Sequence, residues 1–256
     1  MHFDGYGRLV PEGLFAKANL SSRRYFKPNE KSQDPVQIYR NIETYLGRLP
    51  DLSLDEFEAK IAQLKHMLAQ DPHLHQLERC TPIPFILPKG TVTADLQVSM
   101  TTYIASLKRS FEENQPGRHF TDHSIDEWKA LFSINPKSRA ARLMTLCETQ
   151  SVVGLFCPAL PEYSVPAAFE AIEQLPDLLT LSGFFEIAAV LIGSPDYLIN
   201  TKAYSPLLWA TANIGSDQSG GFHFAAYGYD MTLNYRVHLN EASEYWWSGV
   251  TISLKY

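Results

Sequence analysis

Two stretches near the end of the chain decide the predicted fold: residues 231–239 read MTLNYRVHL, and residues 246–256 read WWSGVTISLKY. In both, apolar and polar side chains alternate almost without a break. A period of two is typical of strands that have one buried face and one face in water. If the two strands pair as antiparallel neighbours across the connection 240–244, their polar side chains share one wet face. We therefore expect an antiparallel sheet at this end of the chain, with further strands at 207–211 and 222–226.

Upstream of this sheet, apolar side chains recur at helical spacing. Asp34 and Pro35 are typical of a helix start, and the capping box from Ser53 to Glu56 opens the next helix. Because only a short connection separates these two helices, we expect them to form an antiparallel hairpin. Residues 152–157 are a short apolar run typical of a buried strand. Further helices are predicted from Thr93, from a second capping box at Ser124, and over 165–175 and 181–192, whereas 138–148 is ambiguous.

The order of elements, helices first and strands last, indicates an α+β fold and not a series of βαβ units. We expect an irregular N-terminal arm over residues 1–33 and a single α+β domain over residues 34–256. Within that domain, residues 34–192 are predicted to be helix-rich, and residues 203–256 are predicted to form the antiparallel sheet. A chain of 256 residues can bury a substantial core without disulfides or metals.

The composition is that of an ordinary soluble globular protein, with 45% hydrophobic and 20% charged residues. Three cysteines without a CxxC pair favour reduced thiols in the cytoplasm over a disulfide framework. Cys157 is a candidate nucleophile, although core packing explains it more simply. The first residues do not resemble a signal peptide, and no apolar run approaches the length of a membrane span. We therefore expect a cytoplasmic protein that does not associate with membranes.

Charge is distributed unevenly along the chain. Residues 1–150 contain 19 Lys and Arg against 18 Asp and Glu, whereas residues 151–256 contain 3 against 10. The second part therefore has a net charge of −7, which repels phosphate backbones, so we expect no nucleic-acid partner. In the first part, residues 23–31 interleave four basic side chains with Tyr25 and Phe26. A solvated loop with two anchoring aromatic rings explains that patch most simply.

The polar face of the predicted sheet is the first candidate for a functional surface. Consecutive Trp246 and Trp247 cannot both point inward on a strand with one buried face, so one of them should lie on the polar side. An exposed tryptophan beside arginine, histidine and asparagine is typical of a binding hot spot or a sugar-stacking platform, although a solvated outer face explains the same pattern. We therefore expect an intracellular binding or interaction protein whose partner is a protein or a small molecule. The candidate binding residues are His223, Thr232, Asn234, Arg236, His238 and Trp247.

Catalytic signatures are weak. The common local motifs for phosphate, dinucleotide, zinc and serine-hydrolase sites are absent from the sequence. His119 and His123 flank Asp122 at a spacing that could serve a metal or a proton transfer, although turn roles explain these residues as well. The alternative function is a hydrolase or transferase with a histidine general base, drawn from His119 and His123 or from His223 and His238. That alternative requires two histidines to converge with a carboxylate in a cleft. No metal site is predicted, and the sequence identifies no cofactor.

Overall fold

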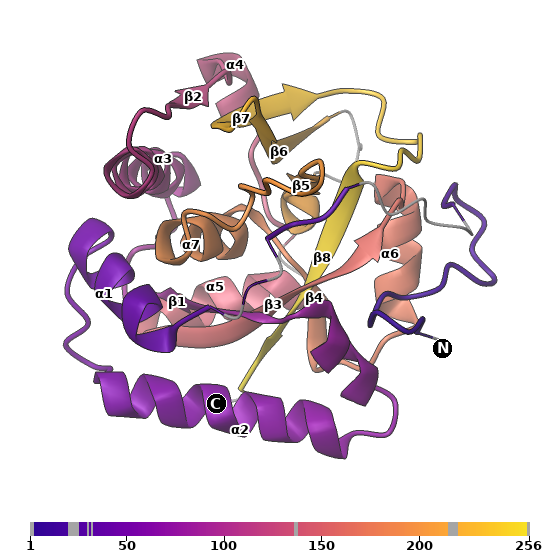
Figure 1. The fold of residues 1–256 in the computed structure, drawn as a ribbon, viewed down its shortest axis with the longest axis horizontal. Coiled ribbons are helices and arrows are strands. Elements are labelled where there is room, and N and C mark those ends of the chain that lie inside the picture. The colour runs from indigo at the N-terminus through magenta and orange to yellow at the C-terminus, as the bar shows by residue number, and fades with distance from the viewer. Residues whose placement is uncertain are drawn as a thin grey trace.

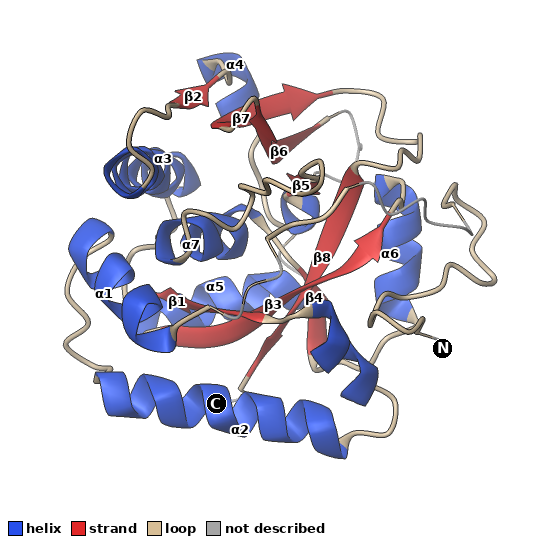
Figure 2. Ribbon diagram, in the orientation of Figure 1, coloured by secondary structure: helices blue, strands red, loops and turns tan. Residues whose placement is uncertain are grey.

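The computed structural model describes residues 3–19, 26–29, 31, 33–135, 138–214 and 220–254, which form one mixed sheet with helices packed around it (Figure 1, Figure 2). The strands follow the order β1-β3-β8-β5-β6-β7-β2, and β4 pairs with β8 beyond the end of β5. Pairs β5–β8 and β2–β7 are parallel, and the other pairs are antiparallel. The predicted α+β class is confirmed at this level. The strands are β1 Ile83–Leu87, β2 Phe120–Asp122, β3 Val152–Pro161, β4 Leu179–Leu181, β5 Leu207–Trp209, β6 Gly221–Tyr227, β7 Asp230–Arg236 and β8 Trp246–Ser253.

Several helix starts follow from local side-chain chemistry. Asp34 and Ser53 cap α1 and α2 as predicted, because their side-chain oxygens accept hydrogen bonds from backbone N–H groups of the first turn. Asp95, and not Thr93, caps α3, since its carboxylate accepts from two N–H groups there. Ser124 does not cap α4, because its hydroxyl bonds the carboxylate two residues earlier. The helices are α1 Pro35–Tyr45, α2 Leu54–Gln70, α3 Leu96–Asn114, α4 Asp126–Lys129, α5 Arg139–Thr149, α6 Val165–Glu173 and α7 Phe184–Gly193.

Helix α7 lies at the centre of the helical part, and all ten of its residues are buried. It packs against α1, α3 and β1. Helix α2 lies along the 3₁₀ helix His75–Cys80 and strand β3. The antiparallel hairpin expected for α1 and α2 stays a prediction. None of the helices in the described ranges has the length and hydropathy needed to cross a bilayer.

The pairing of the C-terminal strands differs from the prediction. Strand β7 pairs with β6 and β2, whereas β8 pairs with β3, β4 and β5. Strands β5 and β6 therefore lie between β7 and β8, which are not neighbours. The register places Trp247 on the face of Leu208, Phe224 and Leu233. The expectation that Trp247 joins Thr232, Asn234 and Arg236 on one sheet face is therefore wrong, because those residues lie on the opposite face.

The alternating pattern of β8 does not mark a wet face, because seven of its eight residues, Trp246–Ile252, are buried. Its hydroxyl groups bond other buried hydroxyls, Ser248 with Thr211 and Thr251 with Ser182, each at 2.8 Å between oxygen atoms. A buried hydroxyl with a partner carries only a small penalty. A buried central strand can therefore show the same alternation of apolar and polar residues as a half-exposed strand, when its polar side chains are hydroxyls that find buried partners.

The two tryptophans at the start of β8 are both buried, with 4% of Trp246 and 6% of Trp247 exposed. Successive side chains of a strand point to opposite faces, so each tryptophan belongs to a different part of the core. The expectation that one of them lies on an exposed polar face is therefore wrong. Both faces of the sheet are covered at this position.

The N-terminal arm (described residues up to Asn29) contains isolated bridges but no described helix or longer strand. Backbone hydrogen bonds hold it against the rest of the chain. The Leu9 N–H donates to the Ala159 carbonyl at 2.8 Å, and the Asn29 N–H donates to the Tyr197 carbonyl at 2.7 Å. These bonds fix the arm beside β3 and the loop after α7, where it forms one wall of a cavity.

Candidate functional site

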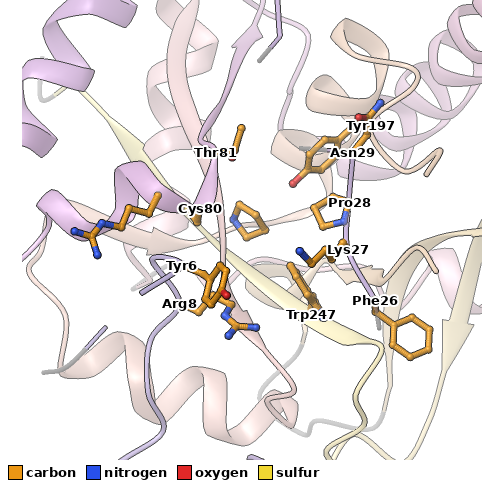
Figure 3. A pocket seen from close by; sticks show the side chains of 12 residues that line it. Tyr6, Arg8, Phe26, Lys27, Pro28, Asn29, Cys80, Thr81, Tyr197 and Trp247 are labelled. Atoms are coloured by element: carbon orange, nitrogen blue, oxygen red, sulfur yellow. The ribbon is translucent and has the colours of Figure 1, made fainter. Parts of the chain in front are cut away.

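The candidate site is a cavity between the N-terminal arm and strand β8, which we call the Trp247 pocket (Figure 3). Its inner space measures about 50 Å³, and the wider recess with its mouth measures about 540 Å³. Six of the twelve lining residues belong to the arm, and the others come from four separate segments of the chain. The lining residues are Tyr6, Arg8, Phe26, Lys27, Pro28, Asn29, Arg79, Cys80, Thr81, Pro158, Tyr197 and Trp247.

The lining combines positive charge with aromatic rings. Among the described residues it contains three cationic side chains, Arg8, Lys27 and Arg79, and no Asp or Glu. Four of the other lining residues are aromatic. One of the three cations, Arg8, is paired with Asp4, so its charge is offset within the protein.

Arg8 is held in position by Asp4. The Arg8 Nε donates to Asp4 Oδ2 at 2.7 Å, and only 9% of Arg8 is exposed. Burial raises the pKa of Asp4, but hydrogen bonds from Arg8 and from backbone N–H groups outweigh burial and leave that pKa below its ordinary value. Asp4 is therefore ionised at neutral pH and fixes the Arg8 guanidinium beside the cavity.

Gly7 lets the arm approach the 3₁₀ helix closely enough to close this wall. Its φ is +74°, and a Cβ at this position would lie 2.4 Å from the Gln76 carbonyl oxygen. Both the left-handed backbone and the close approach require glycine. The neighbours Tyr6 and Arg8 are thereby directed to the cavity from one tight turn, with the Arg8 guanidinium 5.0 Å from the Tyr6 ring centre.

Trp247 lies at the other wall, where parallel pairing places it beside Leu208 of β5. Its Nε1 is buried and makes no hydrogen bond within the described protein. A buried N–H without a partner is costly, and a ligand acceptor or a water in the cavity would remove that cost. Tyr197, which is fully buried, projects toward the same cavity from the loop after α7 (Figure 3).

Cys80 completes the wall as a neutral thiol. Burial, with the neighbouring Cys157 thiol as a second cause, raises the pKa of Cys80 well above its ordinary value. Its Sγ donates to the Leu77 carbonyl at 2.9 Å. Cys157, the candidate nucleophile, is fully buried behind this wall. A nucleophilic cysteine needs a lowered pKa, so the raised pKa of Cys80 does not favour chemistry at that thiol, and burial keeps Cys157 from a substrate.

The predicted polar residues of the sheet lie elsewhere. Strand register places His223 opposite Asn234, with Thr232 and Arg236 on the same face of β6 and β7. This face is largely covered, because His223 is 2% exposed and Thr232 is 8% exposed. His238 lies beyond the end of β7 and is exposed.

The cover over this face is a second, smaller core built with residues of α6 and of β5. His223 packs against Trp209 at 4.9 Å between ring centres. Burial, together with the nearby Arg236 cation, lowers the pKa of His223 to about 3, so its imidazole is neutral at physiological pH. Arg236 lies over the Trp246 ring at 5.5 Å and donates to the Tyr245 hydroxyl at 3.3 Å.

The histidines proposed for catalysis are spread over different environments. His119 and His123 are exposed beside β2, and the His119 Nδ1 lies 4.0 Å from Glu112 Oε1. His223 is buried, and His238 is exposed. Across the part of the chain that the structure describes, no group of three His, Cys, Asp or Glu side chains could hold a metal ion. No contact therefore favours the histidine-based enzyme over a binding protein.

Sequence reasoning found Trp247 but missed the residues that surround it. Those residues come from the arm, the 3₁₀ helix, strand β3 and the loop after α7, so no local pattern connects them. The signal that could have pointed to them is the basic and aromatic stretch 23–31. Its Phe26 and Lys27 line the pocket, whereas Arg23, Arg24 and Tyr25 lie outside the described residues.

Comparison with known proteins found no family model, no curated protein and no solved structure that matches this chain.

Proposed function

We propose that this protein binds a small molecule through a carboxylate or phosphate group held in the Trp247 pocket. The observation that carries this proposal is the lining of the cavity, where the described residues supply three cationic and four aromatic side chains and no carboxylate. The proposal keeps the binding role expected for the C-terminal sheet, because Trp247 belongs to β8. It places the ligand away from the face that carries His223 and Arg236.

The size and chemistry of the cavity support an anionic group. An inner space of about 50 Å³ suits a small group and not a whole ring system. An anion that leaves water needs opposite charge and hydrogen-bond donors. Lys27 and Arg79 supply charge and the Trp247 Nε1 supplies a further donor. The Arg8 guanidinium is already paired with Asp4. The rings of Tyr6 and Phe26 are less buried. They offer an apolar surface at the mouth, against which a planar part of the ligand can pack.

Calorimetric titration with benzoate, phenyl phosphate and neutral benzamide tests this proposal. The two anions have the same ring as benzamide, so charge is the variable. We expect at least one anion to bind about tenfold more tightly than benzamide or better, because a close charge contact in a recess contributes on the order of 1–2 kcal/mol. The two anions together distinguish a carboxylate site from a phosphate site. Equal binding of benzamide and both anions would contradict the proposal.

Variants locate the binding. Lys27→Met should weaken the preferred anion about tenfold, since the substitution keeps the aliphatic stem and removes the charge. Lys65→Met, at an exposed position of α2, is the matched control and should leave the affinity unchanged. Arg8 is less suitable for this test because its ion pair with Asp4 also holds the arm. An equal loss of affinity in both variants, or no loss in either, would contradict the assignment of the anion to the Trp247 pocket.

A further inference from the structure

A wide hollow adjoins the Trp247 pocket. Residues 27–29 line both the pocket and a hollow of about 800 Å³. The loop 196–203, which is hydrogen-bonded to residues 27–29, lines the same hollow. A second hollow of about 470 Å³ shares residues 200–203 with the first and adds Tyr204 and Tyr229. We call the two hollows together the lysine groove, because Lys27, Lys31 and Lys202 line it.

Among the described residues that line the groove, cations outnumber carboxylates. Lys202 is one of only three cations among residues 151–256, which carry ten Asp and Glu, yet it lines the same hollow as Lys27 and Lys31. Of the described residues that line the larger hollow, Asp196 is the acidic one. Its carboxylate already accepts a hydrogen bond from Asn29 Nδ2 at 3.0 Å.

Asn200 fixes the two lysine-bearing segments relative to one another. Its Nδ2 donates to the Lys27 and Pro28 carbonyls at 3.1 and 3.2 Å. Its Oδ1 accepts from the Lys202 N–H at 2.9 Å. The Lys27 N–H, in turn, donates to the Tyr204 carbonyl at 2.7 Å. The lysine groove is therefore built by specific backbone bonds and is organised before a partner binds.

Exposed aromatic rings extend along the same surface. Tyr204 is 73% exposed and Tyr229 is 49% exposed. Phe26 supports Tyr204 at 5.8 Å between ring centres, and the Arg118 guanidinium lies 5.0 Å from the Tyr229 ring centre. Tyr229 sits in the β6–β7 turn with a φ of +74°, a conformation that is uncommon for an aromatic residue. Large exposed tyrosines beside lysines are typical of a surface that contacts an extended partner.

We propose that the lysine groove docks an extended acidic peptide segment, one of whose carboxylates enters the Trp247 pocket. This inference rests on the function proposed above and extends it from a small anion to the segment that carries it. Charge complementarity selects an acidic partner. A short peptide with a few carboxylates is complementary to a local group of lysines, whereas a long phosphate backbone also meets the net charge of −7 in the C-terminal part.

Fluorescence anisotropy with a labelled short peptide of Glu and Gly with one Tyr tests the docking. We expect the peptide to bind more tightly than benzoate, and the same peptide with Gln for Glu to bind at least about tenfold more weakly. Lys202→Glu should weaken the acidic peptide about tenfold and leave benzoate affinity unchanged. Lys65→Glu is the control for added negative charge and should have no effect on either ligand.

A second pair of variants tests whether the exposed tyrosines of the groove contribute to peptide binding. Tyr204→Ser should weaken the peptide several-fold, whereas Tyr227→Ser changes a tyrosine that is 56% exposed but outside the groove lining, and should not. Circular dichroism of each variant verifies that it is folded.

The outcomes separate the two proposals. Benzoate binding with no preference for the acidic peptide, or peptide binding unchanged by Lys202→Glu, overturns the groove and leaves the pocket standing. Peptide binding that depends on Lys202, together with benzoate binding that Lys27→Met leaves unchanged, shows that the pocket assignment has failed, and with it the entry of a carboxylate there. Tighter binding of single-stranded oligothymidylate than of the acidic peptide would overturn the peptide as the partner.

Discussion

At the scale of single residues, two buried titratable side chains have opposite pKa shifts. His223 has its pKa lowered to about 3, mainly by burial. Glu186, in the first turn of α7, has its pKa raised to about 7, again mainly by burial, although the backbone N–H groups of Glu186 and Gly183 partly oppose the shift. In both cases the folded protein favours the neutral form of the side chain. Each residue therefore makes stability depend on pH, in opposite directions.

His223 should make the protein less stable in acid. The unfolded chain takes up a proton near pH 6.5, whereas the folded chain does not do so until about pH 3, so stability is lost as the pH falls between these values. Between about pH 7 and pH 5, urea denaturation should show a loss of about 2 kcal/mol that is absent in His223→Phe. An equal pH dependence in the wild type and the variant would contradict the assigned environment of His223.

Glu186 should make the protein less stable at neutral pH than in mild acid. The unfolded chain loses the proton near pH 4.5, whereas the folded chain keeps it until about pH 7, so stability is lost as the pH rises through this interval. Glu186→Gln should remove a difference of about 3 kcal/mol between pH 4.5 and pH 8, again measured by urea denaturation. If the variant loses as much stability over that interval as the wild type, Glu186 is ionised in the fold.

At the scale of elements, the sequence predicts those features that depend on neighbouring residues. The caps at Asp34 and Ser53 and the buried run that begins at Val152 are local and were predicted correctly. The burial of β8 depends on distant strands that pair with it. Its polar residues Ser248 and Thr251 suggested a solvent-exposed face, although their hydroxyls bond other buried hydroxyls. Strand pairing and pocket lining are long-range properties for which the alternating pattern contains no signal.

An aromatic ring packs directly over Gly249 of strand β8, so this position should not tolerate even one added methyl group. A Cβ at Gly249 would lie 2.2 Å from Cε2 of Phe156, a fully buried ring of β3. Gly249→Ala should therefore lower the free energy of unfolding by about 2–3 kcal/mol, because the ring has little room to move in a close-packed core. Gly5→Ala, where no heavy atom lies within 4 Å of the added Cβ, is the matched control in thermal or urea denaturation. A neutral effect of Gly249→Ala would mean that Phe156 packs differently from the arrangement described here.

At the scale of the whole molecule, the candidate site joins the two ends of the chain. The arm brings Arg8 and Lys27 from the mixed-charge N-terminal part, and β8 brings Trp247 from the acidic C-terminal part. The sequence pointed to Trp247 and to the basic stretch around Lys27 separately. Their meeting depends on the central position of β8 and on the backbone bonds of the arm. Neither can be read from composition or periodicity, so the polar sheet face was the more conspicuous candidate.

The most direct test of the central claim is a crystal structure of the protein with 4-bromobenzoate, in which anomalous scattering locates the bromine. We predict a bromine peak at the mouth of the Trp247 pocket beside Tyr6 or Phe26. The carboxylate should lie within hydrogen-bonding distance of Lys27, Arg8 or the Trp247 Nε1. A bromobenzoate bound only at another position, with the Trp247 pocket holding water alone, would contradict the account.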